Sequence, residues 1–102
     1  MYYIYIVRCD DQSLYTGITT DIKRRLNEHV LKLPTSAAYT KSRNVIALEA
    51  LWSAEDRSLA SKLEYKIKQL TKLKKEQLIL KSEDDDSYIR ITDLSEYDEL
   101  FV

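Results

Sequence analysis

The distribution of hydrophobic and polar residues predicts that the chain begins with a β-hairpin. Residues 2–8 (YYIYIVR) and 14–19 (LYTGIT) are rich in aromatic and β-branched residues, which are typical of strands. The polar stretch DDQS at residues 10–13 separates the two segments and predicts a turn. Two strands joined by so short a turn are expected to pair antiparallel.

A helical period follows the hairpin. Thr20 or Asp21 can cap this helix, which we expect to end near Leu31. Pro34 and the polar residues 35–44 then predict a loop of irregular structure. The apolar residues of the helix recur at every fourth position, as expected of one buried face: Ile22, Leu26 and Val30.

The second half of the chain predicts one more strand and two more helices. Residues 44–52 (NVIALEALW) have the composition of a strand. A helix is expected to begin at Ser53 or Glu55, and Thr71 is expected to cap a shorter helix over residues 72–80. The longer helix has its apolar positions at Leu59, Leu63, Ile67 and Leu70.

This order of elements, β-β-α-β-α-α, predicts the α+β class, with a small three-stranded antiparallel sheet flanked by helices. We expect residues 1–81 to form one domain and residues 82–102 to be an acidic C-terminal extension. Residues 82–87 (SEDDDS) predict a charged linker, and residues 87–92 (SYIRIT) alternate like a strand. The extension contains enough apolar residues that we expect it to dock on the domain rather than remain wholly disordered.

Composition narrows the class of protein. The chain has 102 residues, of which 44% are hydrophobic and 32% charged, which suits one soluble domain with a small core. No apolar run approaches the roughly 20 residues of a membrane helix, and the first residues lack the basic region of a secretory signal. We therefore expect a cytoplasmic protein with no membrane partner. The single cysteine, Cys9, ends an apolar run and is expected to pack as a small hydrophobic residue.

The net charge of −1 hides an uneven distribution. Residues 1–81 contain 15 Lys and Arg against 9 Asp and Glu, whereas residues 82–102 contain 1 against 8. The positive excess on the first part suits a polyanionic partner such as nucleic acid. Simple solvent exposure of Lys-rich helices is the alternative explanation of the same excess.

Charged residues lie beside the apolar positions of both long helices. Arg25 and His29 are four residues apart, so they share one side of the first helix, about 100° from the apolar stripe. Glu64 lies about 100° from Leu63 on the second long helix. Each could be an ordinary residue at the edge of the buried face, with its polar end in water. The 8 tyrosines favour a functional interpretation, because each buried hydroxyl needs a hydrogen-bond partner.

Four motifs, taken in order, resemble the GIY-YIG nuclease superfamily. They are Tyr3-Ile4-Tyr5, Tyr15-Thr16-Gly17, Arg25 followed four residues later by His29, and Glu64. Each motif is weak alone, but the ordered set covers residues 1 to about 80, and it most resembles the small members of the family that stand alone. Two departures are visible: Tyr3 stands where the first motif has glycine, and no asparagine follows Glu64 as it does in several branches.

The resemblance implies metal-dependent hydrolysis of DNA phosphodiester bonds. In the matching positions, Tyr5 would activate or orient the attacking water, and Tyr15 would help to hold that water or the phosphate. Arg25 would bind the scissile phosphate, Glu64 would hold one Mg²⁺ (or Mn²⁺) ion, and His29 matches an accessory position. Because the unperturbed pKa of tyrosine is about 10, either Tyr5 assisted by nearby cations or His29 could be the general base.

The expected partner is DNA, bound by a monomer or weak homodimer that uses no small-molecule cofactor. The basic segment at residues 39–43 (YTKSR) resembles one that the small family members have before their third strand. Two other functions fit the same residues: a nucleic-acid-binding module of this fold that cleaves little, and a protein-interaction domain. The side chains expected to contact DNA are Lys23, Arg24, Lys41 and Arg43.

The only glycine of the chain, Gly17, lies inside the second strand instead of in a loop. A two-residue turn would pair Tyr5 with Ile18 and place Tyr5 and Tyr15 on opposite faces of the sheet. A three-residue loop at 10–12 would pair Tyr5 with Gly17 and place the two tyrosines on one face, as a shared site requires. A bulge could also place them on one face. We therefore predict that Gly17 leaves room for the Tyr5 ring to cross the sheet.

Overall fold

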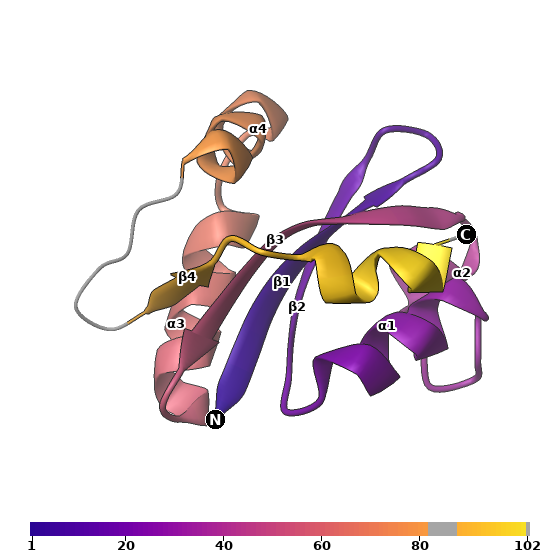
Figure 1. Cartoon of the computed structure of the whole chain (residues 1–102). Coiled ribbons are helices and arrows are strands. Elements are labelled where there is room, and N and C mark those ends of the chain that lie inside the picture. Colours follow the sequence, from indigo (N-terminus) through magenta and orange to yellow (C-terminus); the bar gives the residue numbers. More distant parts are fainter. Residues whose placement is uncertain (82–87, 102) are drawn as a thin grey trace.

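The computed structural model describes residues 1–81 and 88–101 (Figure 1). The predicted linker at 82–87 lies outside the described residues. Across the part of the chain that is described, no helix has both the length and the apolar character that crossing a membrane requires. The elements are β1 (Tyr2–Cys9), β2 (Leu14–Thr19), α1 (Ile22–Val30), α2 (Ala38–Lys41), β3 (Val45–Ala54), α3 (Arg57–Lys68), α4 (Lys72–Leu80), β4 (Ile89–Ile91) and the 3₁₀ helix η1 (Ser95–Phe101).

The α+β class is confirmed, but the predicted number of strands is wrong. Within residues 1–81 and 88–101 the sheet has four antiparallel strands in the order β2-β1-β3-β4. The additional strand, β4, comes from the C-terminal extension and pairs with β3. Its pairing covers an edge of β3 that would otherwise expose unpaired backbone groups.

The predicted register of the hairpin is confirmed. Tyr5 lies opposite Gly17, and Val7 lies opposite Tyr15. The backbone N–H of Cys9 donates to the carbonyl of Ser13 at 2.9 Å, which closes a three-residue loop. The last loop residue, Gln12, has a φ of 70°, the left-handed conformation that such loops use in their final position. Tyr5 and Tyr15 therefore lie on the same face of the sheet.

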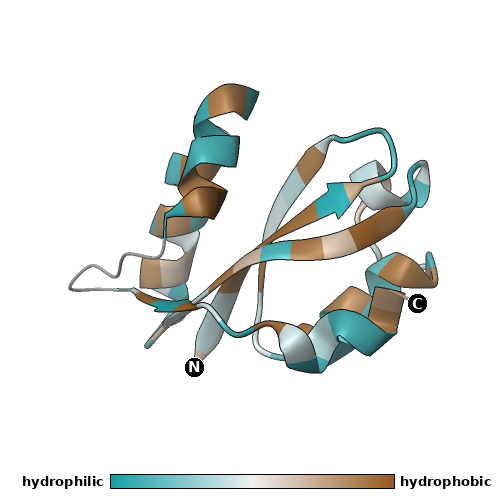
Figure 2. Ribbon diagram, turned by 45° about the horizontal axis from the view of Figure 1, so that its top comes forward, coloured by the Kyte–Doolittle hydropathy of each residue, from teal (hydrophilic) through white to brown (hydrophobic). Residues whose placement is uncertain are grey.

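Helices cover both faces of the sheet (Figure 1). α3 packs on one face, on residues that include Ile4 and Ile6, whereas α1 and η1 pack on the other face with Tyr5 and Val7. Hydrophobic and hydrophilic residues both occur along α4 (Figure 2), where Leu78 and Ile79 pack against the core while Leu73 and Leu80 are exposed. The two layers place α1 and α3 on opposite sides of the outer strand β2.

The helix starts agree with the prediction in two cases and differ in the third. The side chain of Asp21 accepts from the N–H of Arg24 at 3.2 Å, and that of Thr71 accepts from Lys74 at 3.3 Å. The predicted start of the long helix at Ser53 or Glu55 is wrong, because β3 remains paired with β1 as far as Ala54. Asp56 caps α3 instead. The segment expected to be irregular also contains one helical turn, α2.

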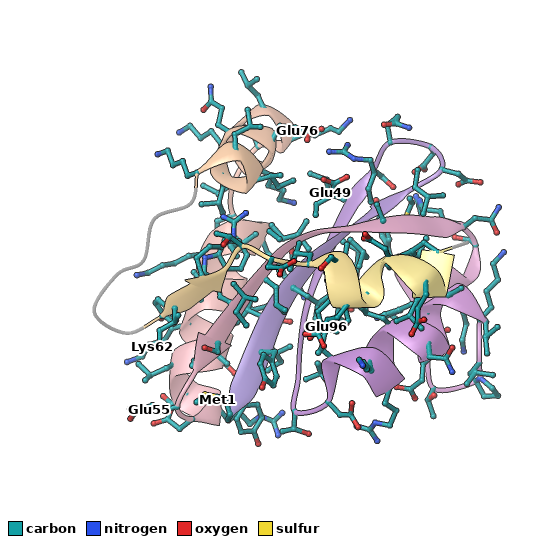
Figure 3. All side chains as sticks on the ribbon, viewed as in Figure 1. Met1, Glu49, Glu55, Lys62, Glu76 and Glu96 are labelled. Atoms are coloured by element: carbon teal, nitrogen blue, oxygen red, sulfur yellow. The ribbon has the colours of Figure 1, made fainter. Side chains whose placement is uncertain are left out.

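A cluster of charged side chains ties α4 to the sheet. Arg8, on β1, contacts Glu49 on β3 and Glu76 on α4, each at 2.9 Å. Figure 3 labels the two glutamates, which lie near each other where α4 approaches the sheet. Arg8 therefore joins elements that are far apart in the sequence.

Candidate active site

The five residues predicted for the site come from four elements that meet near β2. Tyr5 lies on β1, Tyr15 on β2, and Arg25 and His29 on α1. The ring centroids of Tyr5 and Tyr15 are 6.4 Å apart, and those of Tyr15 and His29 are 5.5 Å apart. The carboxylate of Glu64, on α3, is close enough to Tyr5 to raise the pKa of its hydroxyl. These side chains gather at the β2 edge, where both layers of helices can reach them.

A chain of hydrogen bonds runs through the buried part of the site. Tyr5 Oη lies 2.7 Å from Nε2 of His29, and Nδ1 of His29 lies 2.8 Å from Oγ1 of Thr40. Thr40 Oγ1 in turn donates to the carbonyl of Ala37 at 3.0 Å. Tyr5 is 1% exposed, and His29 and Thr40 are 0% exposed. The three side chains therefore exchange hydrogen bonds largely out of contact with water.

The expected position of His29 at the edge of the buried face is wrong. His29 is fully buried, because it lies three residues after Leu26 and seven after Ile22, and these three residues form the inward side of α1. Arg25 does lie at the edge of the buried face, since it is only half-buried. The two residues thus share a side of the helix but differ in their contact with solvent.

Burial sets the protonation of the buried pair. Loss of hydration, followed by the nearby charge of Arg25, lowers the pKa of His29 to about 4. Burial also raises the pKa of Tyr5 above its ordinary value, and the Arg25 guanidinium opposes this shift. At neutral pH both side chains are therefore uncharged.

Arg25 is held in place by its neighbours. Its Nη1 donates to the carbonyl of Thr35 at 2.6 Å and lies 3.5 Å from the carboxylate of Glu28. The hydroxyl of Thr35 also donates to Glu28. Beside these residues lies an open groove of about 410 Å³, which is lined by Tyr2, Ile18, Thr19, Thr20, Arg24, Arg25, Glu28 and Arg57.

Glu64 fits a magnesium ion that keeps most of its water. Its side chain is 23% exposed, and Lys68 Nζ lies 3.5 Å from its carboxylate. Within residues 1–81 and 88–101, no three His, Cys, Asp or Glu side chains are grouped so that they could hold a metal ion. Mg²⁺ does not require such a cage, since it commonly binds one or two carboxylates, several waters and a substrate phosphate.

Comparison with known proteins decides the family. The family model described as the GIY-YIG catalytic domain matches residues 1–77. The chain belongs to the GIY-YIG family. This family has a nuclease fold. The chain is similar to UPF0213 protein FN1575 of Fusobacterium nucleatum, with 42% identity over 87% of this chain and 84% of that protein.

Two other proteins are also similar to this chain. UPF0213 protein DP2720 of Desulfotalea psychrophila is 48% identical over 80% of this chain and 74% of its own length. Among solved structures, that of UPF0213 protein BH0048 from Bacillus halodurans is 37% identical, covers 78% of this chain and 83% of that chain, and has a TM-score of 0.46.

The four residues expected to contact DNA occupy different environments in this GIY-YIG domain. Arg24 lines the groove beside Arg25, and Lys41 is exposed at the end of α2. Lys23 Nζ lies 3.8 Å from the carboxylate of Glu96 on η1. Arg43 pairs with Asp11 at 2.9 Å, and its guanidinium lies 3.9 Å from the centroid of the Tyr39 ring.

Sequence reasoning assigned no role to four residues near the site, although two of them, Tyr39 and Thr40, belong to the basic segment at 39–43. Thr40 completes the buried chain, and Tyr39 stacks on Tyr15 with ring centroids 5.6 Å apart. Lys68 Nζ lies 5.8 Å from the centroid of Tyr15 and also pairs with Glu64. Arg57 lines the groove from the start of α3. The helical spacing from Glu64 to Lys68 was a visible signal, since residues four apart are neighbours on a helix.

Proposed function

We propose that this GIY-YIG protein is a metal-dependent endonuclease that hydrolyses phosphodiester bonds in DNA. The observation that carries the proposal is the buried hydrogen bond between Tyr5 and His29, beside Arg25 and near Glu64. A neutral proton acceptor, an oriented guanidinium and a carboxylate are the kinds of group that phosphodiester hydrolysis uses.

Arg25 would bind the non-bridging oxygens of the scissile phosphate. Negative charge grows on these oxygens as water attacks, and a planar guanidinium offers paired N–H donors to them. Thr35 and Glu28 already hold Nη1 of Arg25, which limits the orientations of the side chain. An oriented cation needs little rearrangement when the charge develops.

Tyr5 and His29 would receive the proton that the attacking water loses. Their neutral state supports this role, because a neutral imidazole can accept a proton whereas an imidazolium cannot. Since Tyr5 is 1% exposed, water would reach Oη only through a local movement of the residues around it. Tyr15 would then help to hold the water or the phosphate at the surface of the site.

Glu64 would hold the divalent ion, Mg²⁺ or Mn²⁺. When bound, such an ion stabilises the negative charge on the leaving oxygen of the phosphodiester. Lys68 lies 3.5 Å from the carboxylate and would hold it in place before the ion binds. The partly exposed position of Glu64 lets waters and a phosphate complete the coordination of the ion.

The groove beside Arg25 would carry the DNA backbone. Arg24, Arg25 and Arg57 line it together with one acidic residue, Glu28, so the lining has a positive excess. The positive excess over residues 1–81 would add a longer-range attraction that weakens as salt rises. The proposal further includes a cytoplasmic monomer or weak homodimer that needs no small-molecule cofactor.

Cleavage of a panel of DNA substrates tests the proposal. Duplex, branched, flapped and single-stranded DNA would each be incubated with wild type, Arg25→Ala and Glu64→Ala, with Mg²⁺ and with a chelator. Each substitution is expected to lower the cleavage rate by on the order of 10² to 10³, because each removes a group that stabilises charge in the transition state.

Glu55→Ala is the matched control for Glu64→Ala, since Glu55 is an exposed glutamate just before α3 and is expected to leave the rate unchanged. Equal activity in wild type and both site variants would contradict the assigned roles. Salt-dependent DNA binding without cleavage in any protein would favour the nucleic-acid-binding module instead.

A further inference from the structure

We propose that Thr40 is a positioning residue that fixes the tautomer of His29, so that Tyr5 donates its proton to His29 and offers only acceptor lone pairs to the attacking water. The proposal rests on the proposed nuclease function for its catalytic consequence. The assignment of the protons rests on the buried hydrogen bonds alone.

The proton of the Thr40 hydroxyl is already committed. Oγ1 lies 3.0 Å from the carbonyl oxygen of Ala37, and a carbonyl can only accept. A hydroxyl has one proton, so Thr40 donates to Ala37 and can act only as an acceptor toward His29. The 2.8 Å contact between Thr40 Oγ1 and His29 Nδ1 is therefore a hydrogen bond only if Nδ1 carries a proton.

The state of Nδ1 determines that of Nε2. A neutral imidazole has one N–H, and burial favours the neutral form of His29. With the proton on Nδ1, Nε2 has a lone pair that accepts from Tyr5 Oη at 2.7 Å. The chain thus runs in one direction, from the Tyr5 hydroxyl through His29 and Thr40 to the Ala37 carbonyl.

This direction determines what Tyr5 can do for a water molecule. Its only proton points to His29 and one lone pair faces the Arg25 guanidinium, so the lone pair that remains would accept a proton from water. In the step we propose, the water oxygen forms a bond to phosphorus and the bond from phosphorus to the leaving oxygen breaks. The proton of the water passes to Tyr5 Oη while Tyr5 passes its own to Nε2 of His29, and the leaving oxygen takes a proton from solvent.

The opposite tautomer would reverse the chain. Nε2–H would donate to Tyr5 Oη, and the Tyr5 proton would then point away from His29, toward the water or the phosphate. Tyr5 would act as a donor, and the site would lose its acceptor. Since Thr40 is fully buried, no bulk water can replace it as the partner of Nδ1.

NMR spectroscopy of the imidazole ring can test the proposal without overlap, because His29 is the only histidine of the chain. Nitrogen chemical shifts and long-range proton–nitrogen correlations of the ring distinguish the two neutral tautomers. We expect the Nδ1–H form in wild type and in Thr40→Ser, which keeps the hydroxyl. Thr40→Val keeps the shape but removes the acceptor, so we expect a shift toward the Nε2–H form.

Cleavage rates add the catalytic readout. We expect Thr40→Val to lower kcat by on the order of 10², with DNA affinity unchanged because Thr40 is buried, and Thr40→Ser to restore most of the rate. Thr16→Val is the matched control, since Thr16 is a buried threonine that alternation places on the opposite face of the sheet from Tyr5. It is expected to change neither the tautomer nor the rate.

The outcomes separate this proposal from the nuclease function. An Nε2–H tautomer in wild type would overturn the role of Thr40, whatever the fold of the variants. A folded Thr40→Val protein with unchanged tautomer and rate would also overturn it. If none of the proteins cleaves DNA, the nuclease function fails, and the ring nitrogen shifts still decide whether Thr40 fixes the tautomer.

Discussion

Substitution of Gly17 by alanine should disrupt the site from beneath, without touching any charged group. A Cβ atom added at Gly17 would lie 2.6 Å from Cζ of the Tyr5 ring and closer still to its hydroxyl oxygen. Nonbonded carbon atoms normally stay about 3.5 to 4.0 Å apart. The ring would therefore have to move by about 1 Å.

Tyr5 has little freedom to make that movement. It is 1% exposed, and its hydroxyl is 2.7 Å from His29 Nε2, so a shift of this size would take the hydrogen bond beyond its useful range. Overpacking of a core costs about 1 to 3 kcal/mol, and a buried polar group left without its partner costs about 1 to 3 kcal/mol. Loss of glycine flexibility in the unfolded chain returns about 0.4 to 1 kcal/mol. We expect Gly17→Ala to lower the free energy of unfolding by about 2 to 4 kcal/mol.

Urea unfolding of a double-mutant cycle measures this effect. Gly17→Ala is introduced into wild type and into Tyr5→Leu, which removes the ring that the new methyl group would meet. The cost of Gly17→Ala should fall below about 1 kcal/mol in the second background, because contacting residues couple whereas independent ones add. An equal cost in both backgrounds, or no cost in wild type, would refute the steric argument.

Two further predictions concern charge. Burial holds the pKa of folded His29 at about 4, whereas an unfolded histidine titrates near 6.5. The free energy of unfolding should therefore be unaffected by the protonation of His29 above about pH 6.5 and should fall by about 3 kcal/mol in all as pH decreases toward 4. Urea unfolding at pH 7 and pH 4.5 should show this loss, and His29→Gln should reduce it. Arg8→Met should lower the free energy of unfolding by about 1 to 3 kcal/mol, because it leaves Glu49 and Glu76 without their shared partner. In thermal unfolding the loss should be smaller when Glu76→Gln is already present. Equal losses in the two backgrounds would contradict the pairing.

The hairpin was predictable because its rules are local. Side chains alternate between the two faces of a sheet, so the length of the loop decides whether Tyr5 and Tyr15 lie on the same face or on opposite faces. The requirement that Tyr5 and Tyr15 share one face favoured the three-residue loop that the structure contains. The caps at Asp21 and Thr71 were predictable for the same reason, since a cap depends on residues within one helical turn.

Features that depend on tertiary contacts were not predictable in this way. Helical spacing places His29 about 60° from Leu26, but only the packing of neighbouring elements on α1 decides whether that position is covered. Thr40 lies in a polar segment without periodicity, and its partner His29 is eleven residues away. The alternation in residues 87–92 indicated a strand, but its place as a fourth strand of the sheet was not predicted, because it depends on pairing with β3.

The buried polar groups of the site are hydrogen-bond partners of one another, and this explains why the proton acceptor for water lies at Tyr5. A small core tolerates buried polar side chains only when each finds a hydrogen-bond partner. The Ala37 carbonyl takes the proton of Thr40, Thr40 takes that of His29 Nδ1, and Nε2 takes that of Tyr5. The chain ends at the Tyr5 oxygen, where a side-chain hydrogen bond from Arg25 uses one lone pair and lowers the pKa of Tyr5. The fold thus leaves one acceptor position at the end of the buried chain, next to the cation that would bind a phosphate.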